Sequence, residues 1–117
     1  MIKKKLVIKS LIWDAWNVAH IARHNVLSEE VEEVCSGNRI VREAYRQRIF
    51  LVGITKTGRI LTVILEPTED QVVYKPITAY DASNRSIKAY QEEKNEEVTK
   101  QHDTTKTRKN KRTYPKV

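Results

Sequence analysis

The amino-acid sequence predicts an α+β fold, in which an antiparallel sheet of four or five strands is packed by two N-terminal helices and one C-terminal helix. Helical patterns are confined to residues 15–36 and 83–98, and short β-branched runs separated by turns fill the interval between them. Strands joined by short turns pair antiparallel, and a sheet with an apolar face needs helices to cover it. The 117 residues suffice for one core, so we expect one domain over residues 1–98.

The N-terminal part is expected to contain one strand and two helices. Residues 5–13 alternate partly between apolar and polar side chains and predict the first strand. Asp14 is a favourable N-cap for a helix over residues 15–24. Asn25 tolerates a left-handed backbone and can end this helix where glycine is usual. A second helix is expected over residues 28–36, with a run of glutamates on its solvated side.

Four further strands are expected before the last helix. They cover residues 39–45, 48–55, 59–66 and 72–79. A short turn near Arg46 and Gln47 joins the first two, and Lys56-Thr57-Gly58 is the strongest turn signal in the chain. Pro76 has no backbone donor, so it should lie at a sheet edge or at a bulge.

The chain is basic, with 22 lysines and arginines against 15 acidic residues and a formal charge of +7. Residues 1–90 alone carry 14 basic and 10 acidic side chains, so the folded part is basic without help from the rest. This excess favours a polyanionic partner, of which nucleic acid is the commonest. Residues 99–117 are polar and rich in Thr and Lys, which predicts a disordered basic tail. The tail is expected either to contact polyanions non-specifically or only to improve solubility.

Cysteine use and hydropathy indicate a cytoplasmic protein. The single cysteine, Cys35, excludes an internal disulfide framework and a cysteine-based zinc cage. Its neighbours Val31 and Val34 indicate a small buried side chain rather than a nucleophile. No apolar run approaches the roughly 20 residues of a membrane span, and the N-terminus is a poor signal peptide.

Three sequence blocks in a fixed order carry a family resemblance. The first is W-D-x-x-N-x-x-H-I-A-R-H-x-V at residues 13–26, followed by S-E-E-V-E-E-V at residues 28–34. The second is R-x-F-L-V-G-x-T-x-x-G-R-x-L-T-V at residues 48–63. The third is I-T-A-x-D-A at residues 77–82, with Arg85 and Tyr90 on the helix that follows. Together they span about residues 10–91, and this region resembles the BrnT-type toxins of bacterial type II toxin–antitoxin modules.

The resemblance implies a small RelE-like α+β fold and a ribonuclease activity that needs no metal or other cofactor. It also implies RNA as substrate and neutralisation by a cognate antitoxin, a DNA-binding protein encoded beside the toxin, in a dimer or a toxin–antitoxin hetero-oligomer. Two positions depart from the family pattern: Asn25 stands where the family commonly has Gly, and Tyr80 stands where it commonly has Arg. Because Tyr80 cannot replace a charge, a catalytically weak or inactive relative that binds nucleic acid or a partner remains the alternative.

Metal-independent cleavage of RNA needs a base for the 2′-hydroxyl proton, an acid for the leaving 5′-oxygen and cations for the phosphorane. Histidine suits the proton transfers and arginine suits the charge. His20, Arg23 and His24 follow helical spacing and are expected on one side of the first helix. The candidate catalytic residues are His20, His24, Arg59, Tyr80 and Arg85, and the candidate RNA-binding residues are Arg23, Arg48, Lys106, Arg108, Lys109, Lys111 and Arg112.

Each candidate also has a structural interpretation. His24 could only complement the helix dipole, the arginines could be solvated, and Tyr80 could be an edge aromatic. Trp13 and Trp16 are expected in the core rather than as base-stacking platforms. No metal site is expected at His20 and His24, because no Glu lies between them as in HExxH.

A third function class is a DNA-binding regulator that uses residues 13–34 as a helix-turn-helix. The second helix would then approach DNA, but its exposed side is acidic and phosphate would repel it. We therefore rank this class below the toxin and the binding protein.

Overall fold

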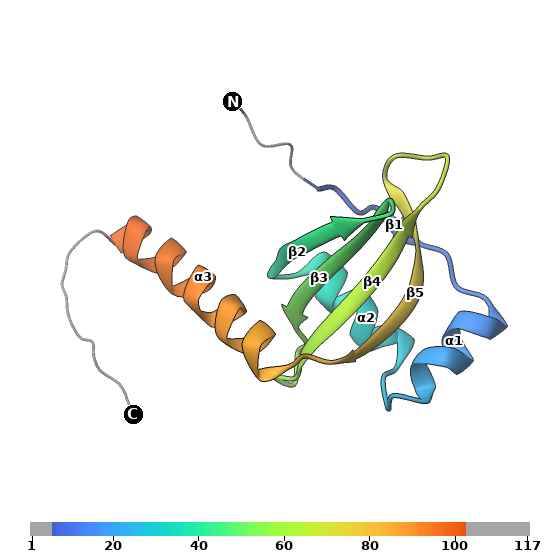
Figure 1. Cartoon of the computed structure of the whole chain (residues 1–117), viewed down its shortest axis with the longest axis horizontal. Helices are drawn as coiled ribbons and strands as arrows, with labels where there is room; N and C mark the ends of the chain where they lie inside the picture. Colours follow the sequence, from blue (N-terminus) through green and yellow to red (C-terminus); the bar gives the residue numbers. More distant parts are fainter. Residues whose placement is uncertain (1–5, 103–117) are drawn as a thin grey trace.

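The computed structural model describes residues 6–102, except for the side chains of residues 43–45 and 96–102. The elements in chain order are β1 (Ser10–Leu11), α1 (Ala15–Ala22), α2 (Ser28–Ser36), β2 (Arg39–Tyr45), β3 (Arg48–Ile54), β4 (Ile60–Pro67), β5 (Val73–Asp81) and α3 (Asn84–His102). The strands form one sheet in the order β1-β5-β4-β3-β2 (Figure 1). The predicted α+β class is confirmed.

The sheet is mixed rather than wholly antiparallel. Strands β2 to β5 pair antiparallel as predicted, whereas β1 pairs parallel with β5. The parallel pairing arises because both N-terminal helices lie between β1 and the rest of the sheet, so the chain crosses over before it returns. Backbone bonds from Lys9 N–H to Val72 O (2.8 Å) and from Ile12 N–H to Tyr74 O (2.9 Å) extend the contact beyond the two residues of β1.

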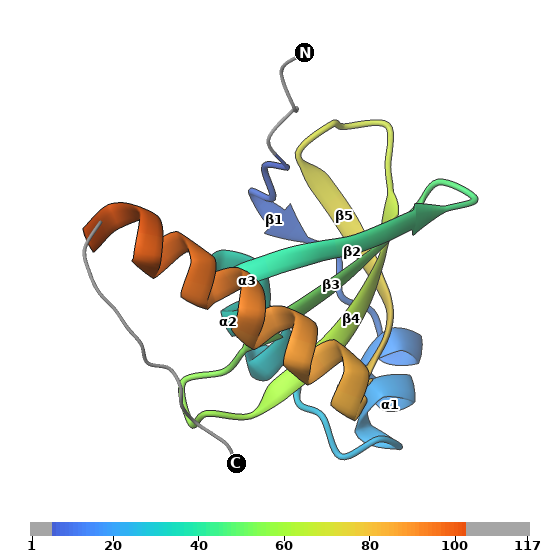
Figure 2. The same cartoon turned by 60° about the vertical axis from the view of Figure 1, so that its left-hand side comes forward.

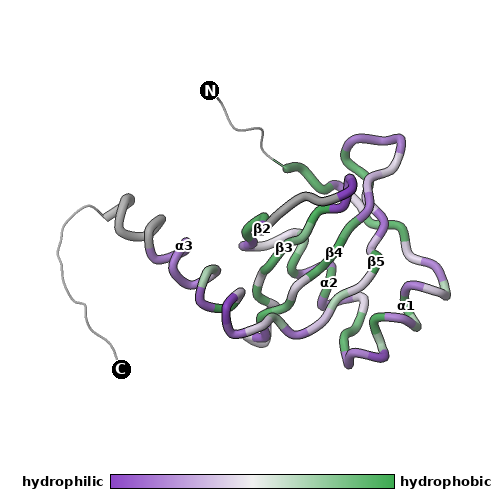
Figure 3. Tube along the Cα trace, viewed as in Figure 1, coloured by the Kyte–Doolittle hydropathy of each residue, from purple (hydrophilic) through white to green (hydrophobic). Residues whose placement is uncertain are grey.

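The two faces of the sheet bury different clusters. Leu51 and Val63 lie on the face covered by α1 and α2, in the main core. Their neighbour Val52 lies on the opposite face with Ile40 and Tyr90, the latter from α3. Figure 2 shows α3 crossing in front of the strands, and Figure 3 shows that the apolar residues concentrate on the strands while the described part of α3 is largely hydrophilic. The α3 face is therefore covered less completely than the other.

Two local predictions about backbone geometry are confirmed. Asn25 has a φ of 61°, in the left-handed region. Pro76 lies at an irregularity of the β4–β5 ladder, where the register passes from Ile64 opposite Thr78 to Leu65 opposite Pro76. The residue of β5 between Thr78 and Pro76 is the extra residue of a bulge. Because a bulge interrupts the ladder, Pro76 does not have to donate a backbone N–H there.

The helix ends differ from the predicted ones in two places. α1 ends at Ala22, two residues before the predicted end. The turn that leads to Asn25 has hydrogen bonds between residues three apart in place of the helical spacing of four. α3 continues to His102, four residues past the predicted end, and residues 103–117 lie outside the described part of the chain. Cys35 is buried as predicted, with 3% of its surface exposed. Within residues 6–102 no helix has the length and apolar character to cross a bilayer.

Candidate active site

Four rings from α1, the turn after it and β5 form a continuous row. Trp16 and His20 stack with centroids 4.8 Å apart and planes at 11°. His24 meets His20 edge to face at 5.7 Å, and on its other side it meets Tyr80 at 6.0 Å. We call these residues the ring row. Three of the five predicted catalytic residues, His20, His24 and Tyr80, are thus neighbours although Tyr80 is remote in sequence.

Hydrogen bonds hold the start of α1 against the sheet. Asp14 Oδ1 accepts the Asn17 backbone N–H at 2.8 Å, and Asn17 Oδ1 accepts the Asp14 N–H at 2.9 Å. The same Asn17 donates from Nδ2 to Ile12 O at 2.9 Å and to Pro76 O at 3.2 Å. Because Asn17 is fully buried and its side-chain donors are satisfied, this pair fixes α1 beside β5.

The end of α1 determines where His24 lies. The Asn25 N–H donates to Ala22 O at 3.0 Å and the Val26 N–H donates to Ile21 O at 3.2 Å. This is the bonding of a Schellman motif, with Asn25 at the left-handed position. Val26 and Ile21 are both buried in the main core, so the turn is anchored and its exposed residue His24 is held over β5.

Arg59 contacts this turn, and each of its three side-chain nitrogens has an acceptor in the protein. Its Nη1 donates to Asn25 O at 2.6 Å and to Glu30 Oε1 at 3.0 Å, and its Nε donates to Asp81 Oδ1 at 2.8 Å. Nη2 reaches His24 O at 3.5 Å. The hydrogen bond to Asp81, followed by that to Glu30, raises the pKa of Arg59. The guanidinium therefore adjoins His24 but spends its donors on protein groups rather than presenting them to a phosphate.

The other predicted cations are distributed over three regions. Arg23 is exposed at the end of α1, next to His24, and Arg85 is exposed in the first turn of α3, five residues after Tyr80. Arg48 lies elsewhere. The strand register aligns Tyr80 with Val52 through β4, and Arg48 is four residues, or about 13 Å, from Val52 along β3. The predicted RNA-binding residues of the tail (Lys106, Arg108, Lys109, Lys111 and Arg112) lie outside the described residues.

The glutamates of α2 also depart from prediction. Glu30 accepts the Leu27 N–H at 3.0 Å as well as binding Arg59, and Glu33 accepts the Lys56 N–H at 3.0 Å. Glu32 accepts the Trp13 indole N–H at 2.8 Å. The acidic run is therefore not simply a solvated face, since three of its four carboxylates join α2 to other segments.

Two contributors to the site were not predicted from the sequence. Trp16 is 60% exposed, so the expectation that it lies in the core is wrong, whereas Trp13 packs against the main core as expected. The signal for Trp16 was its position four residues before His20, which places the two rings on one helix side. The signal for Asn17 was its spacing of three from Asp14, which is that of a capping box.

The described residues contain no group of three or more His, Cys, Asp and Glu side chains placed to hold a metal ion. His20 and His24 instead have aromatic neighbours at either end of the ring row. What the arrangement offers is two imidazoles and a phenol in contact, with exposed arginines adjacent in the chain. These groups can exchange protons with a bound substrate and attract an anion.

Comparison with known proteins supports the fold. No family model and no curated protein matches the sequence. Among solved structures, the crystal structure of the Brucella abortus ribonuclease toxin BrnT is similar, with a TM-score of 0.51 and 23% sequence identity. The similarity covers 64% of this chain and 97% of that toxin. The chain therefore has a BrnT-type toxin fold, as the resemblance implied.

Proposed function

We propose that the protein is a metal-independent endoribonuclease toxin that cleaves RNA at the ring row. The observation that supports this most strongly is the contact of His24 with both His20 and Tyr80, on a fold shared with a ribonuclease toxin. Proton-transferring side chains from two distant segments seldom gather at a partly exposed surface for stability alone, since partly exposed rings contribute less to a core than buried ones.

In the proposed reaction, the 2′-oxygen of the substrate forms a bond to phosphorus while the bond from phosphorus to the 5′-oxygen breaks. His24 takes the proton of the 2′-hydroxyl, and His20 or Tyr80 gives a proton to the 5′-oxygen. The products are a 2′,3′-cyclic phosphate and a 5′-hydroxyl, so atoms and charge balance without water. The spacing of 5.7 and 6.0 Å between ring centroids leaves a phosphodiester within reach of His24 and a neighbour together.

Charge on the phosphorane requires a nearby cation. Among the described residues, Arg23 and Arg85 have no ion-pair partner and both lie near the ring row in the chain, so we assign them this role. Arg59 is instead a positioning residue, because it holds the carbonyl groups of His24 and Asn25.

We further propose that the toxin acts in the cytoplasm and is held by a cognate DNA-binding antitoxin encoded beside it, in a dimer or a toxin–antitoxin hetero-oligomer. The apolar side chains of Trp16, Val18 and Leu27 are 60%, 41% and 62% exposed close to the site. A protein that covers them would bury apolar surface and block access to the ring row in the same contact.

The test is induced expression followed by RNA analysis. The native chain should arrest growth, and the purified protein should cleave single-stranded RNA in the presence of a chelator, leaving 2′,3′-cyclic phosphate ends. His24→Ala should lower cleavage by at least about a hundredfold, the range of a lost acid–base group. The matched control is His102→Ala, which removes the one histidine outside the site and should leave cleavage unchanged. Circular dichroism should show that both variants fold.

A catalytically weak binding protein of the same fold is the second candidate. Two observations favour it: Tyr80 carries no charge where an arginine is common in the family, and Arg59 is occupied by Glu30 and Asp81. No growth arrest, together with intact RNA after incubation with pure protein, would make this second candidate the better one.

A further inference from the structure

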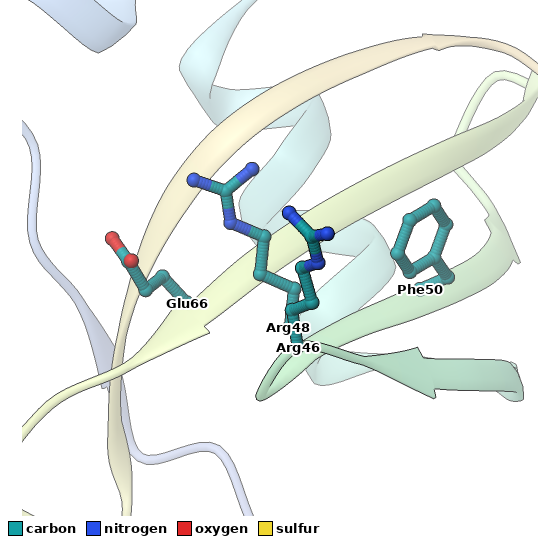
Figure 4. A pocket seen from close by; sticks show the side chains of 4 residues that line it. All are labelled: Arg46, Arg48, Phe50 and Glu66. Atoms are coloured by element: carbon teal, nitrogen blue, oxygen red, sulfur yellow. The ribbon is translucent and has the colours of Figure 1, made fainter.

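A second concave site lies on the α3 face of the sheet, away from the ring row. Arg46, Arg48, Phe50 and Glu66 line a pocket of about 350 Å³. In the view of Figure 4 the two guanidinium groups lie between the carboxylate of Glu66 and the ring of Phe50. The pocket therefore combines positive charge, an aromatic face and one hydrogen-bond acceptor within a single volume.

The turn that carries Arg46 is strained. Arg46 and Gln47 have φ angles of 52° and 67°, and Tyr45 pairs with Arg48 across them. Two central residues at positive φ define a type I′ hairpin, which strongly prefers Asn-Gly. Arg46 therefore holds a backbone conformation that costs energy for a residue with a side chain, while its side chain lines the pocket.

The chemistry of the pocket matches a nucleotide. Guanidinium groups bind phosphate through paired N–H donors, and an aromatic ring stacks on a base. A carboxylate accepts two neighbouring N–H donors, and among the four RNA bases guanine presents such a pair on its Watson–Crick edge. We propose that this pocket binds one guanine nucleotide of the RNA, with its phosphate on Arg46 and Arg48, its base on Phe50 and its N–H groups on Glu66.

The position of the pocket suits a nucleotide away from the cleaved bond. Thr62 pairs with Tyr80, and Glu66 is four residues further along β4, or about 13 Å. Alternate residues of a strand share a face, so Thr62 and Glu66 lie on the same side of the sheet. A nucleotide in the pocket would therefore lie about 13 Å along the ladder from the register of Tyr80. The inference rests on the proposed function for RNA as the ligand, and it adds a determinant of which RNA is chosen.

An acidic peptide is the competing ligand for paired arginines. It would leave Glu66 facing like charge, and it would make no use of the Phe50 ring as a stacking surface. A nucleotide uses every lining residue, so the observations favour it.

The experiment measures fluorescence anisotropy of short 2′-O-methyl oligonucleotides of about six residues, the lower range of single-strand site sizes. The methyl group blocks the 2′-nucleophile, so binding is measured without cleavage. The probes are an all-uridine strand and strands with one central guanosine or adenosine, at about 0.15 M salt. The native full-length chain should bind the guanosine strand tightest. Arg48→Gln and Phe50→Leu should each weaken it about tenfold, a typical loss for one stacked or charge-assisted contact.

The control and the specificity variant separate charge from recognition. Lys56→Gln removes the same charge at an exposed residue of the other hairpin turn and should change affinity less than twofold. Glu66→Gln should abolish the preference for guanosine over adenosine, because the amide cannot accept both N–H donors. An equal loss for Lys56→Gln and Arg48→Gln, or an unchanged guanosine preference in Glu66→Gln, would overturn the assignment. So would tighter binding of a hexaglutamate peptide that depends on the same residues.

A pair of turn variants adds a stability readout. Arg46→Asn should raise Tm and weaken guanosine binding, whereas Gln47→Gly should raise Tm and leave binding intact. A gain in Tm without loss of binding in Arg46→Asn would remove Arg46 from the site. If RNA is not cleaved but binding still depends on the pocket, the nuclease proposal is refuted and the guanine pocket stands. If RNA is cleaved but binding does not depend on the pocket, the guanine pocket is refuted and the nuclease proposal stands.

Discussion

The guanidinium of Arg59 donates to two carboxylates and reaches two backbone carbonyl oxygens, from α2, β5 and the turn after α1. From the sequence alone, Arg59 could equally be a solvated arginine. The contacts of Arg59 favour a structural role, because each of its three side-chain nitrogens already has an acceptor in the protein. Arg59 therefore holds the turn that carries His24.

We expect Arg59→Gln to lower the free energy of unfolding by about 1–3 kcal/mol. This is the range for the loss of charge-assisted hydrogen bonds whose partly buried partners are then left unsatisfied. Cleavage should slow at temperatures where the variant stays folded, since the His24 turn loses its support. The salt dependence of RNA binding should match that of Lys56→Gln, which has the same net charge. A decrease of roughly 0.7 in the salt slope relative to that control, the value for one contact on a single strand, would show that Arg59 contacts phosphate directly.

The burial of Cys35 can be predicted from its neighbours in the sequence. Valines at positions 31 and 34 indicated a buried helix side, and burial raises the pKa of the thiol to about 12. The thiol therefore stays protonated at neutral pH and cannot act as a nucleophile.

At the scale of elements, α1 is held by the reciprocal bonds of Asp14 and Asn17. The Asn17 N–H lowers the pKa of Asp14 below its usual 3.8, and the Lys75 ammonium at 3.4 Å adds to the effect. A lowered pKa in the folded state means that the ionised carboxylate stabilises the fold above the unfolded pKa. This contribution is lost as pH falls through the folded pKa.

We expect the Tm difference between the native chain and Asp14→Asn to be largest near neutral pH and to shrink below about pH 4, where the carboxylate becomes protonated. Asparagine still caps a helix, so the comparison isolates the charge from the hydrogen bond. Thermal melts by circular dichroism over this pH range provide the measurement. A difference that stays constant down to pH 3 would show that the ionised form adds nothing to the stability of α1.

The sequence predicts features that depend on interactions between nearby residues, and it does not predict those that depend on contacts between distant residues. The cap at Asp14, the left-handed Asn25 and the bulge at Pro76 depend on local backbone chemistry, which the residue types specify. The parallel pairing of β1 depends on a crossover, and the contacts of Arg59 join residues 22 or more positions away. Neither has a local signal. The same holds for the pocket, whose wall Glu66 approaches Arg48 only through the pairing of β3 with β4.

At the scale of the whole molecule, two sources of RNA affinity should be separable. The described domain offers the proposed guanine pocket and the ring row, whereas residues 103–117 add six basic side chains and one acidic one. Charges of that kind bind phosphate without reading bases, and each contact raises the salt slope by roughly 0.7 on a single strand. Affinity measured on the full chain therefore mixes a base-dependent part with a salt-dependent part.

Truncation after His102, where α3 ends, should lower the salt slope of binding by up to about 4 and leave the guanosine preference unchanged. The reason is that the tail carries charge but none of the pocket residues. The domain should keep its Tm, because its clusters of buried apolar residues all lie before the cut. Titration of the guanosine and adenosine strands at several salt concentrations checks both parts together. An unchanged slope would exclude the tail from RNA binding, and a lost guanosine preference would locate base recognition in the tail instead of the sheet.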